Sequence, residues 1–227
     1  MTTQAVEHFL SQAANLSGLK DIHWLEDQRR AAMASLTATG FPTRKVEDWK
    51  YTDISPILKK NFSLATSDDT EDIQSSLASA QMNTLDCYQL VFINGRFSAS
   101  HSSLNDLPEN VDIASLNETL KDQTIDLSSY LNREDEYKDG FVALNMSLME
   151  DGAVIQVGKN VELDKPVNLV FISTGKDQPA QNIRNIIIAG ANSRIEVIET
   201  YTGPSTSEYF TNTVTEAWLE DGAGLNH

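Results

Sequence analysis

The chain has 227 residues, with 17 Lys or Arg against 33 Asp or Glu, and so carries a formal net charge of −16. A charge of this sign and size repels nucleic acid and anionic lipid, and we expect neither as a partner. The one cysteine, Cys87, excludes an internal disulfide and a metal site built from several thiolates of this chain. No apolar run approaches the roughly 18 residues that a membrane span needs, and no secretory signal pattern follows Met1. These features predict a cytoplasmic protein.

Residues 1–86 form a predicted N-terminal helical region. Apolar residues recur at helical spacing from about Gln4 to Thr39. Gly40 and Pro42 then end the second helix in the usual order, with Gly just past the end and Pro beyond it. A short helix is predicted behind the polar stretch at 66–72.

Residues 87–140 form a second predicted segment, in which the apolar spacing changes. The β-rich run Tyr88–Ile93 is followed by Asn94-Gly95, a strong hairpin signal, and the chain returns through residues 96–98. A β-hairpin is therefore expected here. One or two helical turns are expected at 115–120.

Residues 141–227 form the third predicted segment: one helix over 141–149, beginning near Asp139 or Gly140, and β-structure from there to the end. Strands are predicted at 154–157, 161–163, 169–172, 183–188, 195–198 and 211–219. Such short, frequent strands fit a sandwich, a barrel or a solenoid. Gly-Ala pairs begin at Gly152, Gly190 and Gly222, at a similar spacing, and this near-repeat favours the solenoid.

Three stretches together resemble a known family. The segment Phe41–Ile54 is similar to a Pro-x-x-x-x-Glu-x-Trp-Lys-Tyr-Thr motif found near the start of SufD proteins, which belong to the SufB/SufD family. The hairpin residues 91–97 fit the same pattern. The Gly-Ala turns and β-branched strands from Gly152 onward are similar to the core that SufB and SufD share.

The resemblance implies a mainly β fold, in which a right-handed parallel β-helix follows the N-terminal helices. It implies a non-catalytic scaffold for iron–sulfur cluster assembly that works in a complex with SufB and the ATPase SufC. The cluster is then the product of the whole complex, and this chain is expected to bind no cofactor or metal. The β-helix is expected to be incomplete here, with most contacts to SufB and SufC beyond residue 227. An open strand edge at the C-terminal end is expected to self-associate.

The resemblance carries over one set of site residues, Glu47, Trp49, Lys50, Tyr51 and Thr52, with a structural or interaction role. The aromatic pair in this motif could also form a stacking surface for a ligand, although packing against the body of the protein is the simpler expectation. No catalytic residue is expected.

The other reactive side chains suggest no further site. Cys87 could be a thiolate ligand, but a small buried apolar side chain is the expected role. The four histidines, which are His8, His23, His101 and His227, stand far apart in the sequence.

Three alternatives stay open at this point. SufB is the nearest, but SufB chains generally carry additional cysteines in this region. A β-helix that binds or cleaves polysaccharide would need paired carboxylates facing outward from neighbouring strands. Glu196 and Glu199 flank one predicted strand, and the sequence does not say which face each occupies. A secreted adhesin is the third alternative, and the missing export signal counts against it.

Overall fold

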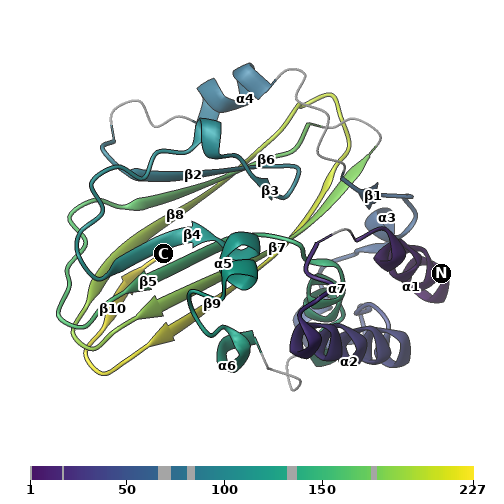
Figure 1. Ribbon diagram of the computed structural model, residues 1–227. Coiled ribbons are helices and arrows are strands. Elements are labelled where there is room, and N and C mark those ends of the chain that lie inside the picture. The colour runs from purple at the N-terminus through teal and green to yellow at the C-terminus, as the bar shows by residue number, and fades with distance from the viewer. Residues whose placement is uncertain (1, 17, 66–72, 81–84, 132–136, 175–177) are drawn as a thin grey trace.

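The computed structural model describes residues 2–16, 18–65, 73–80, 85–131, 137–174 and 178–227. Helices and strands are both abundant (Figure 1). The helices are α1 (Thr2–Ser11), η1 (Gln12–Asn15), α2 (His23–Thr39), η2 (Glu47–Trp49), α3 (Ser55–Leu58), α4 (Ile73–Ala80), η3 (Ala99–His101), α5 (Leu116–Asp122), α6 (Ser128–Leu131) and α7 (Gly140–Leu148), where η marks a 3₁₀-helix. The strands are β1 (Ser63–Leu64), β2 (Tyr88–Ile93), β3 (Arg96–Phe97), β4 (Val111–Ser115), β5 (Ala153–Val157), β6 (Val167–Ile172), β7 (Pro179–Ala189), β8 (Arg194–Thr202), β9 (Phe210–Leu219) and β10 (Gly224–Asn226).

The strands form two mixed sheets. In the first sheet β7 is central: it pairs in parallel with β1 and β5 along one edge and with β9 along the other, and β4 joins β5 antiparallel. The second sheet has the order β10-β8-β6-β2-β3, parallel except for the β2–β3 hairpin. Strands from all three predicted segments thus enter these sheets. The division of the chain at residues 86 and 140 stays a prediction.

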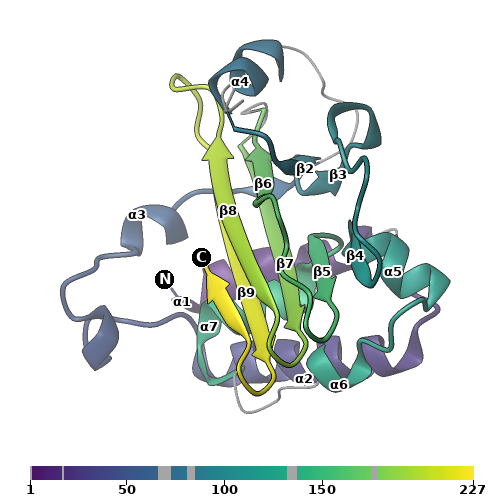
Figure 2. The ribbon, with the colours of Figure 1, turned by 90° about the vertical axis from the view of Figure 1, so that its left-hand side faces the viewer.

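From β5 onward the strands alternate between the two sheets, and from β7 onward each strand pairs in parallel with the strand two strands before it. Val157 pairs with Ala189, which pairs with Leu219, so the partners recur at a nearly constant spacing in the sequence. In the other sheet Arg194 pairs with Gly224 at a similar spacing. We call β5 to β10 the coil; its strands run side by side in Figure 2.

The repeat in the coil is real, but the three Gly-Ala pairs do not occupy matching positions in it. Gly152 lies just before the start of β5, whereas Gly190 comes just after the end of β7 and before the turn at 191–192. Since Ala189 pairs with Leu219, Gly190 aligns with Glu220 and not with Gly222. The matching turn positions are Asn160, Asn192 and Gly222, which all have positive φ, at 59°, 58° and 73°. Gly and Asn tolerate this left-handed conformation better than other residues, so the repeated feature is a backbone requirement at the turn.

Three apolar layers hold the molecule together. The first lies between the two sheets and includes Leu90, Phe92, Ile155, Leu169 and Ile187, all fully buried. The second lies between the first sheet and helices α1, α2 and α7. The third is a small layer in which α4 covers the outer face of β2 and β6. The N-terminal helices therefore cover one face of the first sheet (Figure 1).

Local signals account for several elements. Asn94 and Gly95 have φ of 50° and 75°, as a two-residue hairpin turn with both central residues left-handed requires, so the predicted hairpin is confirmed. The Asp139 carboxylate accepts hydrogen bonds from the backbone N–H groups of Phe141 and Val142 and caps α7 at the predicted place. Gly140 is needed because an added Cβ would lie 2.5 Å from the carbonyl oxygen of Gly40, where α2 ends against α7.

Some expectations were wrong. The class is not mainly β, since helices take 34% of the described residues and strands 30%. The predicted strand at 161–163 is reduced to a single bridge between Glu162 and Arg194.

The polar stretch at 66–72 lies outside the described residues, whereas the helix predicted behind it is confirmed as α4.

Candidate interaction surface

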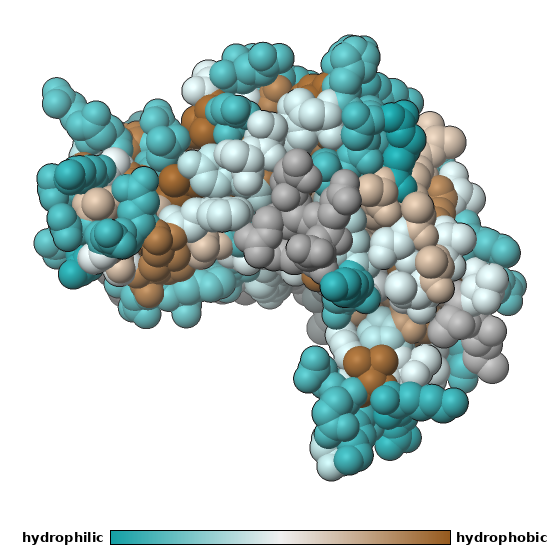
Figure 3. Space-filling view, turned by 90° about the horizontal axis from the view of Figure 1, so that it is seen from below, coloured by the Kyte–Doolittle hydropathy of each residue, from teal (hydrophilic) through white to brown (hydrophobic). Residues whose placement is uncertain are grey.

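The motif residues lie on a loop, residues 43–53, between α2 and α3. Phe41 and Ile54 flank this loop and are buried, with 3% and 7% exposure. Within the loop every residue is exposed except Trp49, which is half-buried. The loop leaves the body between two buried anchors and returns to it, and it projects away from the strands (Figure 2). In the space-filling view it forms a narrow, largely hydrophilic lobe (Figure 3).

Trp49 attaches the loop to the body. Its ring lies 5.2 Å from that of Phe141 at the start of α7, and Phe141 lies 5.2 Å from Phe41. Phe141 in turn lies 6.3 Å from Phe210 at the start of β9. Tilted aromatic pairs at these separations add packing energy beyond their buried area. The indole therefore packs the loop against α7, and Phe141 continues the aromatic contacts to the coil.

The other four motif residues face solvent. Tyr51 has 88% exposure, and Glu47, Lys50 and Thr52 are exposed as well. The Lys50 ammonium lies 5.5 Å from the centre of the Tyr51 ring, within the range of a cation–π contact. Trp49 and Tyr51 therefore do not form one stacking surface, because one ring packs inward and the other points away from the body. The motif therefore combines one residue that packs against the body, Trp49, with four residues that are exposed to solvent.

Asp53 accepts a hydrogen bond at the base of the loop. The pKa of Asp53 is lowered, chiefly because the Ser55 backbone N–H donates to its carboxylate at 2.9 Å, with smaller contributions from the nearby Arg44 and Lys59. Arg44 Nε also donates to the Lys50 carbonyl oxygen at 3.3 Å. Asp53 thus remains ionised at neutral pH, with two cations beside it.

Cys87 lies outside this surface, immediately before β2. It is partly buried, and its pKa is raised, first by that burial and then by the Asp86 carboxylate, against an opposing effect of Lys165. A raised pKa keeps the thiol protonated, which disfavours its use as a thiolate ligand. In the ranges that the structure describes, no three His, Cys, Asp or Glu side chains group as ligands for a metal ion.

Three of the four histidines contact different groups. His8 Nε2 contacts the Phe62 carbonyl oxygen at 2.8 Å, and His101 Nδ1 contacts the Ser98 hydroxyl at 2.8 Å. His227 Nε2 contacts Glu199 Oε1 at 3.0 Å, and His23 begins α2.

Glu196 and Glu199 do not form a pair. They are an odd number of positions apart on β8 and so face opposite sides of the sheet. Glu199 Oε1 accepts a hydrogen bond from Thr215 Oγ1 at 2.7 Å, whereas Glu196 is exposed. Glu196 and Glu199 therefore do not supply the outward-facing carboxylate pair that a polysaccharide-cleaving β-helix would need.

Two buried polar groups were not found from the sequence. Arg184 on β7 is fully buried, and its guanidinium contacts the Glu216 carboxylate on β9 through Nε at 2.9 Å and Nη2 at 2.7 Å. The two residues occupy neighbouring turns of the coil, so the repeat, correctly aligned, would have suggested the pair. Asp151 accepts hydrogen bonds from the backbone N–H groups of Phe97, Asn117 and Gly152 and from the Ser115 hydroxyl. In the sequence, the residues around Asp151 indicated only a turn before the strand that is now β5.

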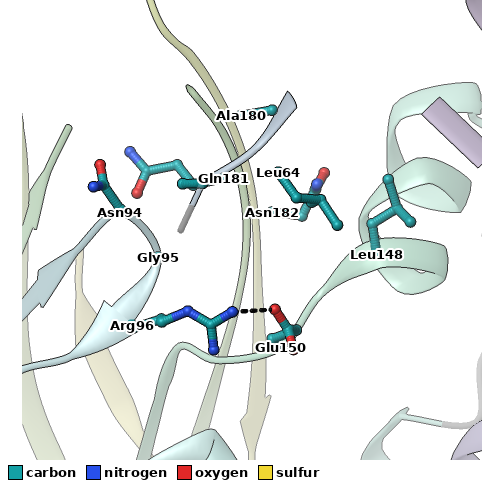
Figure 4. Close-up of a pocket in the computed structure, with 10 residues that line it drawn as sticks. Leu64, Asn94, Gly95, Arg96, Leu148, Glu150, Ala180, Gln181 and Asn182 are labelled. Carbon is teal, nitrogen blue, oxygen red and sulfur yellow. Dashed lines mark hydrogen bonds and ion pairs between the residues drawn. The ribbon is translucent and has the colours of Figure 1, made fainter. Parts of the chain in front are cut away.

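A small pocket lies where the hairpin turn meets β7 (Figure 4). Asn94, Gly95 and Gln181 line it, and Arg96 Nη2 contacts Glu150 Oε2 at 2.7 Å beside it. Its volume of about 20 Å³ suits a single water molecule. The pocket therefore belongs to the packing of the hairpin against the first sheet, and we assign it no ligand.

No described helix has the length and apolar character needed to cross a bilayer.

Comparison with known proteins matches two family models, which together run along almost the whole chain. Residues 2–169 match the SufBD protein N-terminal region, and residues 171–227 match the SufBD core domain of SUF-system FeS cluster assembly. An iron–sulfur cluster assembly SufBD family protein of Synechocystis is 29% identical over 230 residues, covering 96% of this chain and 49% of that protein.

Two other curated relatives are more distant. The chloroplastic protein ABCI7 of Arabidopsis thaliana is 26% identical, over 89% of this chain and 43% of its own length. The iron–sulfur cluster assembly protein SufD of Escherichia coli is 25% identical, over 88% of this chain and 44% of its own length. The chain thus spans about half the length of the curated relatives it matches. With one family model covering most of the chain and a second the remainder, this chain belongs to the SufBD family.

Proposed function

We propose that this chain is part of a SufD-type scaffold that takes part in iron–sulfur cluster assembly without catalysing a step itself. The observation that carries the proposal is the match of both family models, one of which is described as SUF-system FeS cluster assembly. SufB and the ATPase SufC are the proposed partners, with most of their contacts beyond residue 227. The cluster is the product of the whole complex. A cytoplasmic location remains a prediction.

The assignment to SufD over SufB rests on two observations. The chain has a single cysteine, whereas SufB chains are expected to carry more in this region. One of the matched relatives bears the name SufD.

The coil is the proposed beginning of a right-handed parallel β-helix. Its support is the parallel stacking of β5, β7 and β9 in one sheet and of β6, β8 and β10 in the other. Paired positions recur at a nearly constant spacing from turn to turn, and the side chains between the two sheets form one continuous apolar layer. Such stacking gives a scaffold a long rigid surface, since each turn of a β-helix packs only against the turns next to it.

The test is co-purification of the affinity-tagged product of the complete gene with SufB and SufC from the same organism. We expect both partners to be retained, and we expect iron and sulfide to be incorporated into the resulting complex. The 227-residue chain, tagged in the same way, is expected to retain the partners poorly. If the complete product retains neither SufB nor SufC, the proposal is wrong.

A further inference from the structure

A groove lies between the α3 segment and the connection from β8 to β9, which is residues 203–209. Its volume is about 350 Å³. Its walls are largely apolar, and Tyr209 in one of them has 36% exposure. The residues that form the walls are Pro56, Ile57, Phe62, Pro204, Ser207 and Tyr209. A hollow of this size and character on a protein surface indicates that another segment or molecule packs into it.

An ion pair joins the two walls of the groove. Lys60 Nζ donates to both carboxylate oxygens of Glu208, at 2.7 and 2.9 Å, and Gln178 Nε2 also donates to Glu208 at 3.1 Å. The Phe62 ring of one wall lies 5.6 Å from the Phe210 ring at the start of β9. Lys60 and Glu208 are the two charged residues in the described lining. Their charges cancel, so the groove favours an uncharged, apolar occupant.

The size of the groove favours an occupant from the same chain. Nine described residues line it, whereas a stable interface between two proteins uses about 20–30 residues on each side. A segment of the same chain needs less contact, because the tether raises its effective concentration at the groove.

The spacing of the coil identifies the segment that follows the 203–209 connection. Ile172 pairs with Thr202 before this connection, and Ala180 pairs with Phe210 after it, 30 residues apart in both cases. β10 pairs with β8 at the same spacing. The corresponding connection after β10 therefore falls at about positions 233–239. The chain spans about half the length of its curated relatives, so the complete gene product is expected to contain this segment.

The groove opens towards the side on which that segment would be added. The preceding turn of the coil covers one side of the 203–209 connection, since the Ser173 N–H donates to the Thr202 carbonyl oxygen at 2.9 Å and Gln178 contacts Glu208. Figure 2 shows α3 on the opposite side, beyond β9 in the direction away from β5. The next turn of the coil would therefore lie against both walls.

We propose that the groove between α3 and the 203–209 connection holds the next turn of this chain's own β-helix, with an apolar side chain of that turn seated between Ile57 and Tyr209. The inference rests on the part of the proposed function in which the coil begins a longer β-helix. The α3 segment then ties the N-terminal helices to the later turns, and the groove is not available to SufB or SufC.

The test uses the complete gene product with Cys87→Ser as the background. Ser207→Cys places a thiol in the groove with little change of volume, and a second cysteine is placed in turn at each position of the proposed segment. Two cysteines form a disulfide only when their Cα atoms lie within about 7 Å of each other. Mild oxidation is expected to join at least one of these pairs within a single molecule, and mass spectrometry of the digested protein identifies the pair. Ser100→Cys on η3, an exposed site outside the groove, is the matched control and is expected to form no such disulfide.

Three results would overturn the inference. If no position of the proposed segment pairs with the thiol of Ser207→Cys, the segment does not occupy the groove. A disulfide that joins two molecules would make a second copy the occupant. Loss of maleimide labelling at Ser207→Cys only after SufB or SufC is added would make that subunit the occupant.

These results are distinguishable from failure of the proposed function. A complete product that retains SufB and SufC but forms no disulfide in the groove keeps the scaffold role and loses this inference. A product that forms the disulfide but retains neither partner keeps the inference and loses the scaffold role. Circular dichroism of each variant shows that a missing disulfide does not come from unfolding.

Discussion

Trp49 and Tyr51 show how residues of similar chemistry take different roles two positions apart. The indole packs on Phe141, while the phenol ring stands in solvent with 88% exposure. Both are large amphipathic side chains that bury well when the backbone allows it. The turn at Thr52, whose N–H bonds to the Trp49 carbonyl oxygen, directs the two rings apart.

The first prediction follows from this difference. Trp49→Ala should lower the free energy of unfolding by about 2 kcal/mol, because a half-buried aromatic contact between the loop and α7 is lost. Tyr51→Ala should change it by less than about 0.5 kcal/mol, since little of that ring is buried. Urea denaturation followed by circular dichroism measures both. Equal destabilisation by the two changes would mean that Tyr51 also has a packing role.

The second prediction concerns Cys87, whose pKa is raised by burial and by Asp86. Iodoacetamide reacts with the thiolate, so Cys87 should be alkylated more slowly than free cysteine near neutral pH and faster as the pH rises. Asp86→Asn removes the carboxylate and should speed the reaction by lowering the pKa. Lys165→Gln removes the opposing cation and should slow it. Mass spectrometry of quenched samples gives the rates, and a Cys87 as reactive as free cysteine would contradict the assignment.

At the scale of the elements, β7 and β9 are joined by a buried ion pair as well as by backbone hydrogen bonds. Arg184 has no exposed surface and the Glu216 side chain has 9%, so each charge depends on the other for compensation. Burial of one unpaired charge costs more free energy than replacement of both by apolar groups.

The third prediction uses that asymmetry. Glu216→Gln should lower the free energy of unfolding by about 3 kcal/mol, because the Arg184 charge then lies buried without its carboxylate. The double change Arg184→Met with Glu216→Leu should cost less than the single change. Glu196→Gln on the exposed face of β8 is the control and should leave stability unchanged. A double variant less stable than Glu216→Gln would show that the pair itself is a net source of stability.

Some helices and strands could be located from local sequence patterns alone, and others could not. The hairpin at Asn94-Gly95 and the cap of α7 at Asp139 were predictable, because both depend on a few adjacent residues. The coil repeat was found with the wrong alignment, because Gly152 resembles Gly190 in sequence and occupies the other end of a strand. Strand pairing between successive turns of the coil is decided by which turns can stack, and no local pattern contains that information.

At the scale of the molecule, the helices and the coil are parts of one packed structure. Aromatic rings from α1, from the segment just after α2 and from β9 meet in the layer between helices and sheet: Phe9 lies 5.8 Å from Phe210, and Phe41 lies 5.9 Å from Phe9. At the edge of the first sheet, β9 pairs only with β7 as far as the structure describes the chain. Leu219 at the end of that strand has 46% exposure.

The fourth prediction is that this 227-residue chain self-associates through the edge of β9. An exposed strand edge with apolar side chains is a template for pairing, and a charge placed on it opposes that pairing. Light scattering should give a mass that rises with concentration, and Leu219→Lys should reduce the rise. Leu85→Lys, at a site with 38% exposure outside both β9 and the 43–53 loop, should not. A monomer at every concentration would contradict the prediction.

The sequence by itself determined the family, the acidic character, the N-terminal helices and the presence of a β-repeat, because each depends on composition, short motifs or local spacing. It also predicted the motif that carries the candidate surface. Only the tertiary structure separated Trp49 from Tyr51, brought Arg184 to Glu216 and placed Glu196 and Glu199 on opposite faces. Those outcomes depend on contacts between residues far apart in the chain, which form only once the two sheets and the helical layer have packed together.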